Sequence, residues 1–129
     1  MRLKHWLTIA ALGLLVPTAG HAATEANFGA KTTGDLAALC SATPDNGLGT
    51  AALNFCEGYL EGAVTVEMLN QSTFRGPKLF CLPTPPPTRL ETMSAFVSWA
   101  RAAPDRTAQM PTDGLFRFLS ERYPCSSSH

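Results

Sequence analysis

Four cysteines and three histidines are the side chains of this sequence that could act as nucleophiles, bases or metal ligands. The cysteines stand, in chain order, at Cys40, Cys56, Cys81 and Cys125. The histidines, His5, His21 and His129, all lie near the two ends of the chain. A nucleophilic site needs a base beside its serine or cysteine, and a zinc site usually contains closely spaced ligand pairs. Gaps of 15, 24 and 43 residues between successive cysteines contain no such pair, so neither kind of site is expected.

One pair of carboxylates has a spacing that could support acid–base chemistry. Glu57 and Glu61 are four residues apart, which places both on one face of a helix, as a general acid and base require. The alternative is a solvated outer face, because two like charges at this spacing cost only a few tenths of a kcal/mol. We favour the solvated face. No glycine-rich phosphate loop is present either, so the sequence predicts neither an enzyme nor a bound cofactor.

The N-terminal segment has the pattern of a secretory signal peptide. Arg2 and Lys4 precede an apolar run from Trp6 to Val16, and Gly20 and Ala22 fit a small-x-small cleavage site. The run has 11 residues, whereas a membrane-spanning helix needs about 20, so an uncleaved anchor is less favoured. We therefore expect a signal peptide over residues 1–22, a single domain over 23–129, and a periplasmic protein with no membrane association after cleavage.

The composition of the chain after signal-peptide cleavage argues against two classes of binding partner, nucleic acids and anionic lipids. Removing Arg2 and Lys4 leaves eight basic and ten acidic side chains, so the mature chain is weakly acidic. It has no basic footprint for nucleic acid and no polybasic patch for anionic lipid. An even number of cysteines beyond an export signal is typical of disulfides.

The sequence predicts an all-α fold, a small four-helix bundle-like domain, because no stretch alternates apolar and polar residues as strands do. Capping residues open three of the helices: Thr33 and Asp35, the box from Thr88 to Glu91, and Thr112 with Asp113. The longest helix, over about residues 50–70, contains no proline. Residues 23–31 are expected to be a loose lead-in, 82–87 a stiff proline-rich spacer, and 101–110 a polar loop.

The helix order predicts the disulfide pairing. Cys40 ends the first helix and Cys56 lies early in the second, so a hairpin between them brings the two together. If the third helix runs back and the fourth returns, Cys125 reaches the end where Cys81 lies. We therefore choose Cys40–Cys56 and Cys81–Cys125 from the three possible pairings. The chain-entropy model assigns these bridges about 3 and 4 kcal/mol.

Two features suggest contact with another molecule. Gly58 and Gly62 lie four apart within the long helix, and each costs about 1 kcal/mol relative to alanine. Close packing within the chain would explain them, and so would a homodimer or another partner. The segment after this helix carries Phe74, Arg75 and Lys78, and aromatic and arginine side chains are frequent interface anchors. The alternative for Phe74 is that it folds back onto the core.

Three short motifs resemble those of a known family. They are Asn54-Phe-Cys-Glu-Gly-Tyr-Leu-Glu-Gly62, Phe80-Cys-Leu-Pro83 and Tyr123-Pro-Cys125. In this order, in a small exported helical chain, they are similar to those of the Tai-type immunity proteins. These are periplasmic proteins that protect a bacterium from peptidoglycan amidase toxins delivered by type VI secretion. The likeness runs from about Leu36 to Cys125.

The resemblance implies a small helical inhibitor, often dimeric, that blocks the substrate cleft of its cognate amidase effector and catalyses nothing. It implies no particular inhibitory contact, so Phe74, Arg75 and Lys78 are candidates for partner contact because of their residue types alone. The residues that it carries over as structural framework are Cys56, Gly58, Tyr59, Gly62, Cys81, Pro83, Pro124 and Cys125. The alternative function is a periplasmic stress or holdase protein without a toxin partner, which would bind clients through exposed apolar surface.

Overall fold

The structure, a computed structural model, describes residues 22–126, and every regular element in that range is helical. The predicted all-α class is therefore confirmed. The elements are η1 (Glu25–Gly29), α1 (Thr33–Cys40), α2 (Gly47–Thr73), α3 (Arg89–Arg101), α4 (Pro104–Thr107) and α5 (Pro111–Arg122). The predicted signal peptide lies, except for Ala22, outside the described residues, as do His5, His21 and His129.

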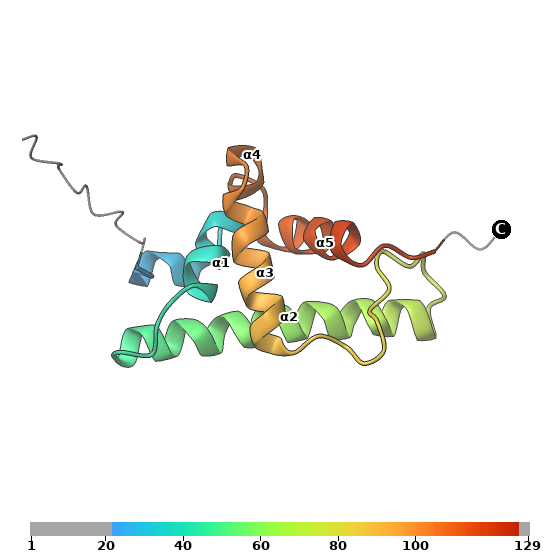
Figure 1. Cartoon of the computed structure of the whole chain (residues 1–129), viewed down its shortest axis with the longest axis horizontal. Helices are drawn as coiled ribbons and strands as arrows, with labels where there is room; N and C mark the ends of the chain where they lie inside the picture. The colour runs from blue at the N-terminus through green and yellow to red at the C-terminus, as the bar shows by residue number, and fades with distance from the viewer. Residues whose placement is uncertain (1–21, 127–129) are drawn as a thin grey trace, which may run out of the picture.

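Helix α2 is the longest element and extends beyond both of its predicted ends. It begins at Gly47 because the side chain of Asn46 accepts a hydrogen bond from the Gly49 amide at 2.9 Å and caps the helix. It ends at Thr73, and Arg75 then adopts the left-handed conformation, with φ of 52°. Figure 1 shows α2 running the length of the molecule, with the other helices gathered along one side of it.

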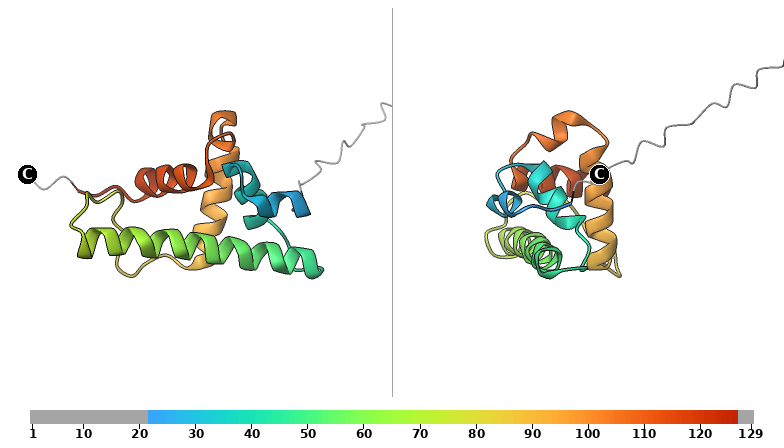
Figure 2. Two further views of the ribbon diagram at one scale, coloured as in Figure 1. Left: turned by 180° about the vertical axis from the view of Figure 1, so that it is seen from behind. Right: turned by 90° about the vertical axis from the view of Figure 1, so that its left-hand side faces the viewer.

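The other helices are organised around α1, which contacts η1 and each of α2 to α5. Helix α3 runs across α2, in the views of both Figure 1 and Figure 2. This differs from the simple expectation that the third helix runs back along the second. The short α1 is inserted between α2 and the later helices, so α3 packs mainly on α1 rather than alongside α2.

The core lies where α1, α3 and α5 meet the inner face of α2. Its largest fully buried side chains include Phe96, Phe118, Leu36, Leu39, Leu115 and Leu119. Helical spacing places Leu90 on the same face of α3 as the buried Met93 and Ala100, but it is 72% exposed. It lies in the first turn of α3, at the edge of the stripe that Met93 and Ala100 bury. Helical periodicity indicates which face is buried, but not how far along the helix its neighbours reach.

Several helix ends differ from prediction. The capping box of α1 is Thr32 with Asp35, and Thr33 is instead the first helical residue, fully buried. Helix α5 begins with Pro111 after Met110, not with the predicted cap of Thr112 and Asp113. The capping box of Thr88 and Glu91 at α3 is confirmed. The predicted lead-in contains the short helix η1, and the predicted polar loop contains α4.

Both predicted disulfides are confirmed. Cys40 and Cys56 are joined at an S–S distance of 2.00 Å, and Cys81 and Cys125 at 2.05 Å. The first bridge ties the end of α1 to α2. The second ties the segment after α2 to the segment after α5, where the Cys81 amide also donates to the Tyr123 carbonyl at 2.8 Å.

Candidate functional site

The segment that directly follows α2, residues 74–79, is exposed along most of its length, and we call it the binding loop. Phe74 is 71% exposed and Leu79 is 43% exposed. The expectation that Phe74 folds back onto the core is therefore wrong. Val66, Met68 and Leu69, on the last turns of α2, add further exposed apolar surface. An aromatic side chain at the centre of such a surface is typical of a protein-binding site.

The binding loop also presents two cations. Arg75 and Lys78 are both exposed. Neither takes part in any of the ion pairs that the structure has within residues 22–126. Their charges are thus available to acidic groups of another molecule. Phe74, Arg75 and Lys78 are all exposed on this segment, and their contact with a partner stays a prediction.

The binding loop is held at both of its ends. The amides of Phe74 and Gly76 both donate to the Asn70 carbonyl at 3.2 Å. A Cβ on Gly76 would lie only 2.5 to 2.8 Å from the side-chain amide of Asn70, so any larger residue here would displace the Asn70 side chain. At the other end Phe80 is buried and Cys81 enters its disulfide. The loop is therefore ordered before any partner arrives, which lowers the entropy cost of binding.

Beneath the binding loop lies a buried acidic side chain, Glu67, which sequence reasoning missed. It is only 5% exposed. Its carboxylate accepts hydrogen bonds from Asn70 Nδ2 at 3.3 Å and Gln71 Nε2 at 3.0 Å, and from the amide of Leu79 at 3.5 Å. Glutamate is almost never fully buried, so nothing in the sequence pattern distinguishes this residue from its exposed neighbours.

The two helical glycines of α2 lie in open space. A Cβ added to Gly58 or to Gly62 would meet no atom within 4 Å. Close packing within the chain therefore does not explain them, and that expectation is wrong. The helical repeat places both on the same side as the exposed Leu69, opposite the buried Ala52, Cys56 and Leu60. We call this side of α2 the open face.

The carboxylates of Glu57 and Glu61 both lie near one cationic side chain, that of Arg89. Arg89 Nη2 lies 2.8 Å from Glu61 Oε2, and Arg89 Nη1 lies 3.9 Å from Glu57 Oε2. All three side chains are well exposed, at 42% to 66%. They border an apolar groove of about 310 Å³ between α2, the proline-rich segment and α3. A shared, solvated guanidinium is the arrangement of a surface ion pair, and nothing in it resembles an acid–base pair of an enzyme.

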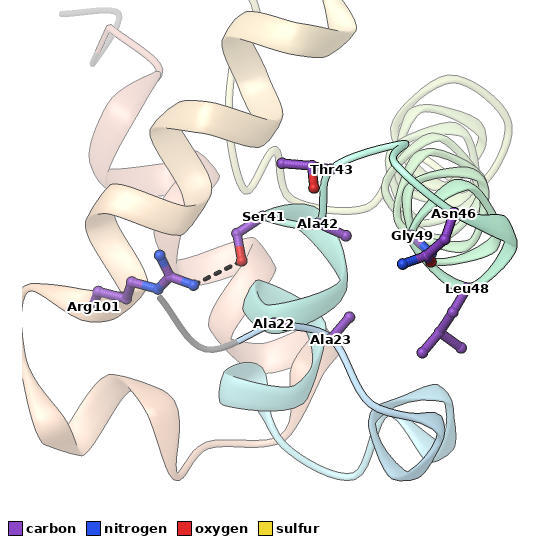
Figure 3. Close-up of a pocket in the computed structure, with 9 residues that line it drawn as sticks. All are labelled: Ala22, Ala23, Ser41, Ala42, Thr43, Asn46, Leu48, Gly49 and Arg101. Carbon is purple, nitrogen blue, oxygen red and sulfur yellow. Dashed lines mark hydrogen bonds between the residues drawn. The ribbon is translucent and has the colours of Figure 1, made fainter. Parts of the chain in front are cut away.

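A second hollow lies where α1 turns into α2 (Figure 3). Its lining includes Ser41, Asn46 and Arg101, and Arg101 Nη2 donates to Ser41 Oγ at 2.7 Å. The side chain of Asn46 is already occupied as the cap of α2. Among residues 22–126, neither a carboxylate nor a histidine contributes to this lining, so these residues supply no acid–base pair to the hollow.

The segment 101–110, which the sequence predicts to be a polar loop, is largely engaged in contacts within the chain. The guanidinium carbon of Arg106 lies 4.6 Å from the centre of the Trp99 ring, and Arg106 Nη1 donates to the Trp99 carbonyl at 2.8 Å. Trp99 Nε1 in turn donates to Glu121 Oε2 at 2.6 Å. This hydrogen bond, followed by the one from Arg117, lowers the pKa of Glu121. The cluster fixes α4 against α3 and α5.

The remaining framework residues have structural contacts. The hydroxyl of Tyr59 lies 2.7 Å from Thr112 Oγ1, which joins α2 to α5. Pro83 and Pro124 flank the Cys81–Cys125 bridge and are exposed. All four cysteines are oxidised. Residues 22–126 contain no group of three or more metal-ligating side chains. In the same range no helix is both long and apolar enough to pass through a bilayer.

Comparison with known proteins gives one match. A family model described as Rap1a immunity proteins matches residues 32–125. No curated protein and no solved structure matches the chain. The matched region includes both disulfides, the open face of α2 and the whole binding loop.

Proposed function

The chain belongs to the family of Rap1a immunity proteins, and from this we propose that it neutralises a peptidoglycan amidase toxin of a type VI secretion system in the periplasm. The family implies an inhibitor of a toxin rather than an enzyme. The motifs around Cys56, Cys81 and Cys125, which are similar to those of the Tai-type immunity proteins, support the choice of an amidase. The proposed action is occlusion of the amidase's active site.

The proposed compartment is supported by the oxidation state of the cysteines. Two disulfides are typical of a protein that works in an oxidising compartment. The segment over residues 1–22, proposed as a signal peptide, would deliver the chain to the periplasm. Peptidoglycan lies in that compartment, so a toxin that cleaves it can be met there.

The observation that carries the proposal is the preorganised binding loop. Phe74 is 71% exposed, and the two cations that follow it in the chain, Arg75 and Lys78, have no acidic partner within the described residues. The backbone that presents it is fixed by Asn70 and by the Cys81–Cys125 disulfide. We propose that Phe74 inserts into the toxin and that Arg75 and Lys78 pair with acidic groups beside the insertion point.

We also propose that the open face of α2 takes a second copy of the chain. Gly58 and Gly62 allow another backbone to approach α2 closely, and Leu69 supplies apolar area beside them. Helical glycines each cost about 1 kcal/mol, and no contact within the chain offsets that cost. Sedimentation equilibrium of the mature chain tests this proposal: dimers support it, and a monomer at all accessible concentrations refutes it.

Co-expression tests the proposed function. The candidate toxin is the product of the gene beside the one that encodes this chain, exported to the periplasm with and without the chain. We expect lysis without the chain, survival with it, and a complex on gel filtration. Phe74→Ala should restore lysis, whereas Leu90→Ala is the matched control, because Leu90 is exposed to the same extent but lies on α3. Unchanged lysis together with no complex would refute the proposal.

The alternative holdase function rests on the same exposed apolar residues of α2 and the binding loop. It predicts that the mature chain suppresses aggregation of unrelated denatured proteins, particularly at low pH, and that no single toxin forms a stoichiometric complex with it. Suppression of aggregation without toxin binding would favour this function over neutralisation.

A further inference from the structure

The burial of Glu67 needs an explanation beyond stability. A carboxylate that is 5% exposed loses most of its contact with water. No lysine or arginine of residues 22–126 lies within ion-pair distance of it. Its hydrogen-bond donors are the uncharged groups of Asn70, Gln71 and Leu79. Burying a carboxylate without a charged partner is costly, so a glutamate at this position indicates a requirement for its acceptor oxygens.

Glu67 is connected to the binding loop in two ways. The first is direct, because Glu67 Oε1 accepts from the amide of Leu79, at the end of the loop, at 3.5 Å. The second passes through Asn70. Glu67 Oε2 accepts from Asn70 Nδ2 at 3.3 Å, which orients the amide plane against which Gly76 packs. The carbonyl of Asn70 also receives the amides of Phe74 and Gly76.

We infer that Glu67 is a positioning residue for toxin binding: it holds the binding loop in the conformation that presents Phe74, Arg75 and Lys78. This inference rests on the proposed function, since it assigns the toxin contact to the binding loop. Glu67 itself is buried and touches no partner. Its effect on affinity comes through the backbone of residues 74–79, whose order before binding reduces the conformational entropy lost in the complex.

Three variants of the mature chain test the inference. Glu67→Leu removes both acceptor oxygens. Glu67→Gln keeps one acceptor oxygen and the size of the side chain. Glu61→Leu makes the same chemical change at an exposed position of α2 that has no hydrogen bond to the binding loop, and it serves as the matched control. Asn70→Ala removes only the connection from Glu67 to the binding loop that passes through the Asn70 side chain. It replaces Glu67→Leu as the test if Glu67→Leu does not fold.

The first readout is amide hydrogen exchange of the chain alone, resolved by residue with NMR. In Glu67→Leu, we expect the amides of Gly76 and Leu79 to exchange about tenfold faster or more, while amides in the core of α2 keep their protection. In Asn70→Ala, we expect the same change at the amide of Gly76. Glu67→Gln should recover most of the protection, and Glu61→Leu should match the wild type. Unchanged exchange at both amides in Glu67→Leu would overturn the inference.

The second readout is affinity for the proposed toxin, the product of the neighbouring gene. We expect Glu67→Leu to weaken binding by about tenfold or more, mainly through a faster dissociation rate, and Glu67→Gln to restore most of it. Faster exchange with unchanged affinity would overturn the positioning role while leaving toxin binding intact. If the wild type itself does not bind the toxin, the proposed function fails, and so does the role of Glu67 in toxin binding. The exchange data would still decide whether Glu67 holds the binding loop in place.

Discussion

Gly114 of α5 lies directly against Thr33 of α1, so closely that a Cβ on Gly114 would overlap the Thr33 side chain. Thr33 is fully buried, and its hydroxyl donates to the carbonyls of Gln109 and Met110 at 3.2 and 3.1 Å. The Thr33 amide also donates to the Gln109 carbonyl at 2.8 Å. One threonine thereby joins the start of α1 to the segment that leads into α5, and the glycine makes that approach possible.

The helical glycines should respond in opposite directions to the same substitution. Gly114→Ala should lower the free energy of unfolding by about 1 to 3 kcal/mol, because the added methyl group has no room. Gly58→Ala and Gly62→Ala should each raise it by about 0.5 to 1 kcal/mol, since their methyl groups meet open space and alanine favours the helix. Urea denaturation of the monomeric chain measures all three. A stabilising Gly114→Ala would contradict the close packing of α1 and α5.

The hydrogen bond from Trp99 to Glu121 predicts a pH dependence. The pKa of Glu121 lies below its ordinary value of 4.5, first because of Trp99 and then because of Arg117. Ionised Glu121 therefore stabilises the fold fully above pH 4.5, and this contribution is lost as the pH falls through the lowered pKa. Relative to Glu121→Gln, the wild type should be more stable at neutral pH, and the difference should shrink in acid.

Trp99 supplies the signal for this measurement, because it is the only tryptophan of a chain that begins at Ala23. Urea unfolding of both proteins, followed by its fluorescence from neutral pH to about pH 3, gives the difference in free energy. Leu90→Ala is a suitable control, since it leaves the cluster around Trp99 unchanged. A difference that stays constant over this range would show that Glu121 is not linked to folding in this way.

The two disulfides should contribute unequally to stability. Removing Cys81–Cys125 by a double alanine substitution should lower the free energy of unfolding by about 4 kcal/mol in the chain-entropy model, and removing Cys40–Cys56 by about 3 kcal/mol. Cys40 and Cys56 are buried, so their removal adds the cost of a cavity. Denaturation of the two variants compares these losses. A loss below about 1 kcal/mol for either pair would contradict the role of that bridge as a staple.

The Cys81–Cys125 pair should also affect the binding loop. Its bridge follows the buried Phe80 and closes the end of residues 74–79. The alanine variant should therefore show faster amide exchange at Leu79, whereas the Cys40–Cys56 variant should not. Equal exchange at Leu79 in both variants would mean that the bridge does not anchor the loop.

The helices and the Cys40–Cys56 pairing could be predicted from the sequence because both depend on local pattern, whereas the Cys81–Cys125 pairing is correct although the third helix does not run back along the second as assumed. Apolar spacing and capping residues predicted α1, α2, α3 and α5, and the positions of Cys40 at the end of one helix and Cys56 early in the next predicted the first bridge. Helix α4 escaped notice because four residues are too few for a periodic pattern, although Pro104 stands at its first position.

Features that depend on tertiary contact could not be predicted in this way. The contact of Thr33 with Gly114 joins residues far apart in the chain. Glutamate is usually a surface residue, and Glu67 is buried only because residues 74–79 pass over it. The two glycines of α2 could be identified by spacing, but whether they face the core or open space depends on which side of the helix α1 and α3 pack against.

The central claim is that this chain inhibits an amidase by binding it through Phe74. The most direct measurement is hydrolysis of purified peptidoglycan by the proposed toxin, the product of the neighbouring gene, titrated with mature wild-type chain, Phe74→Ala and Leu90→Ala. We predict that wild type and Leu90→Ala abolish hydrolysis near equimolar ratio, and that Phe74→Ala requires about tenfold more protein or greater. Undiminished hydrolysis in the presence of excess wild-type chain would contradict the account.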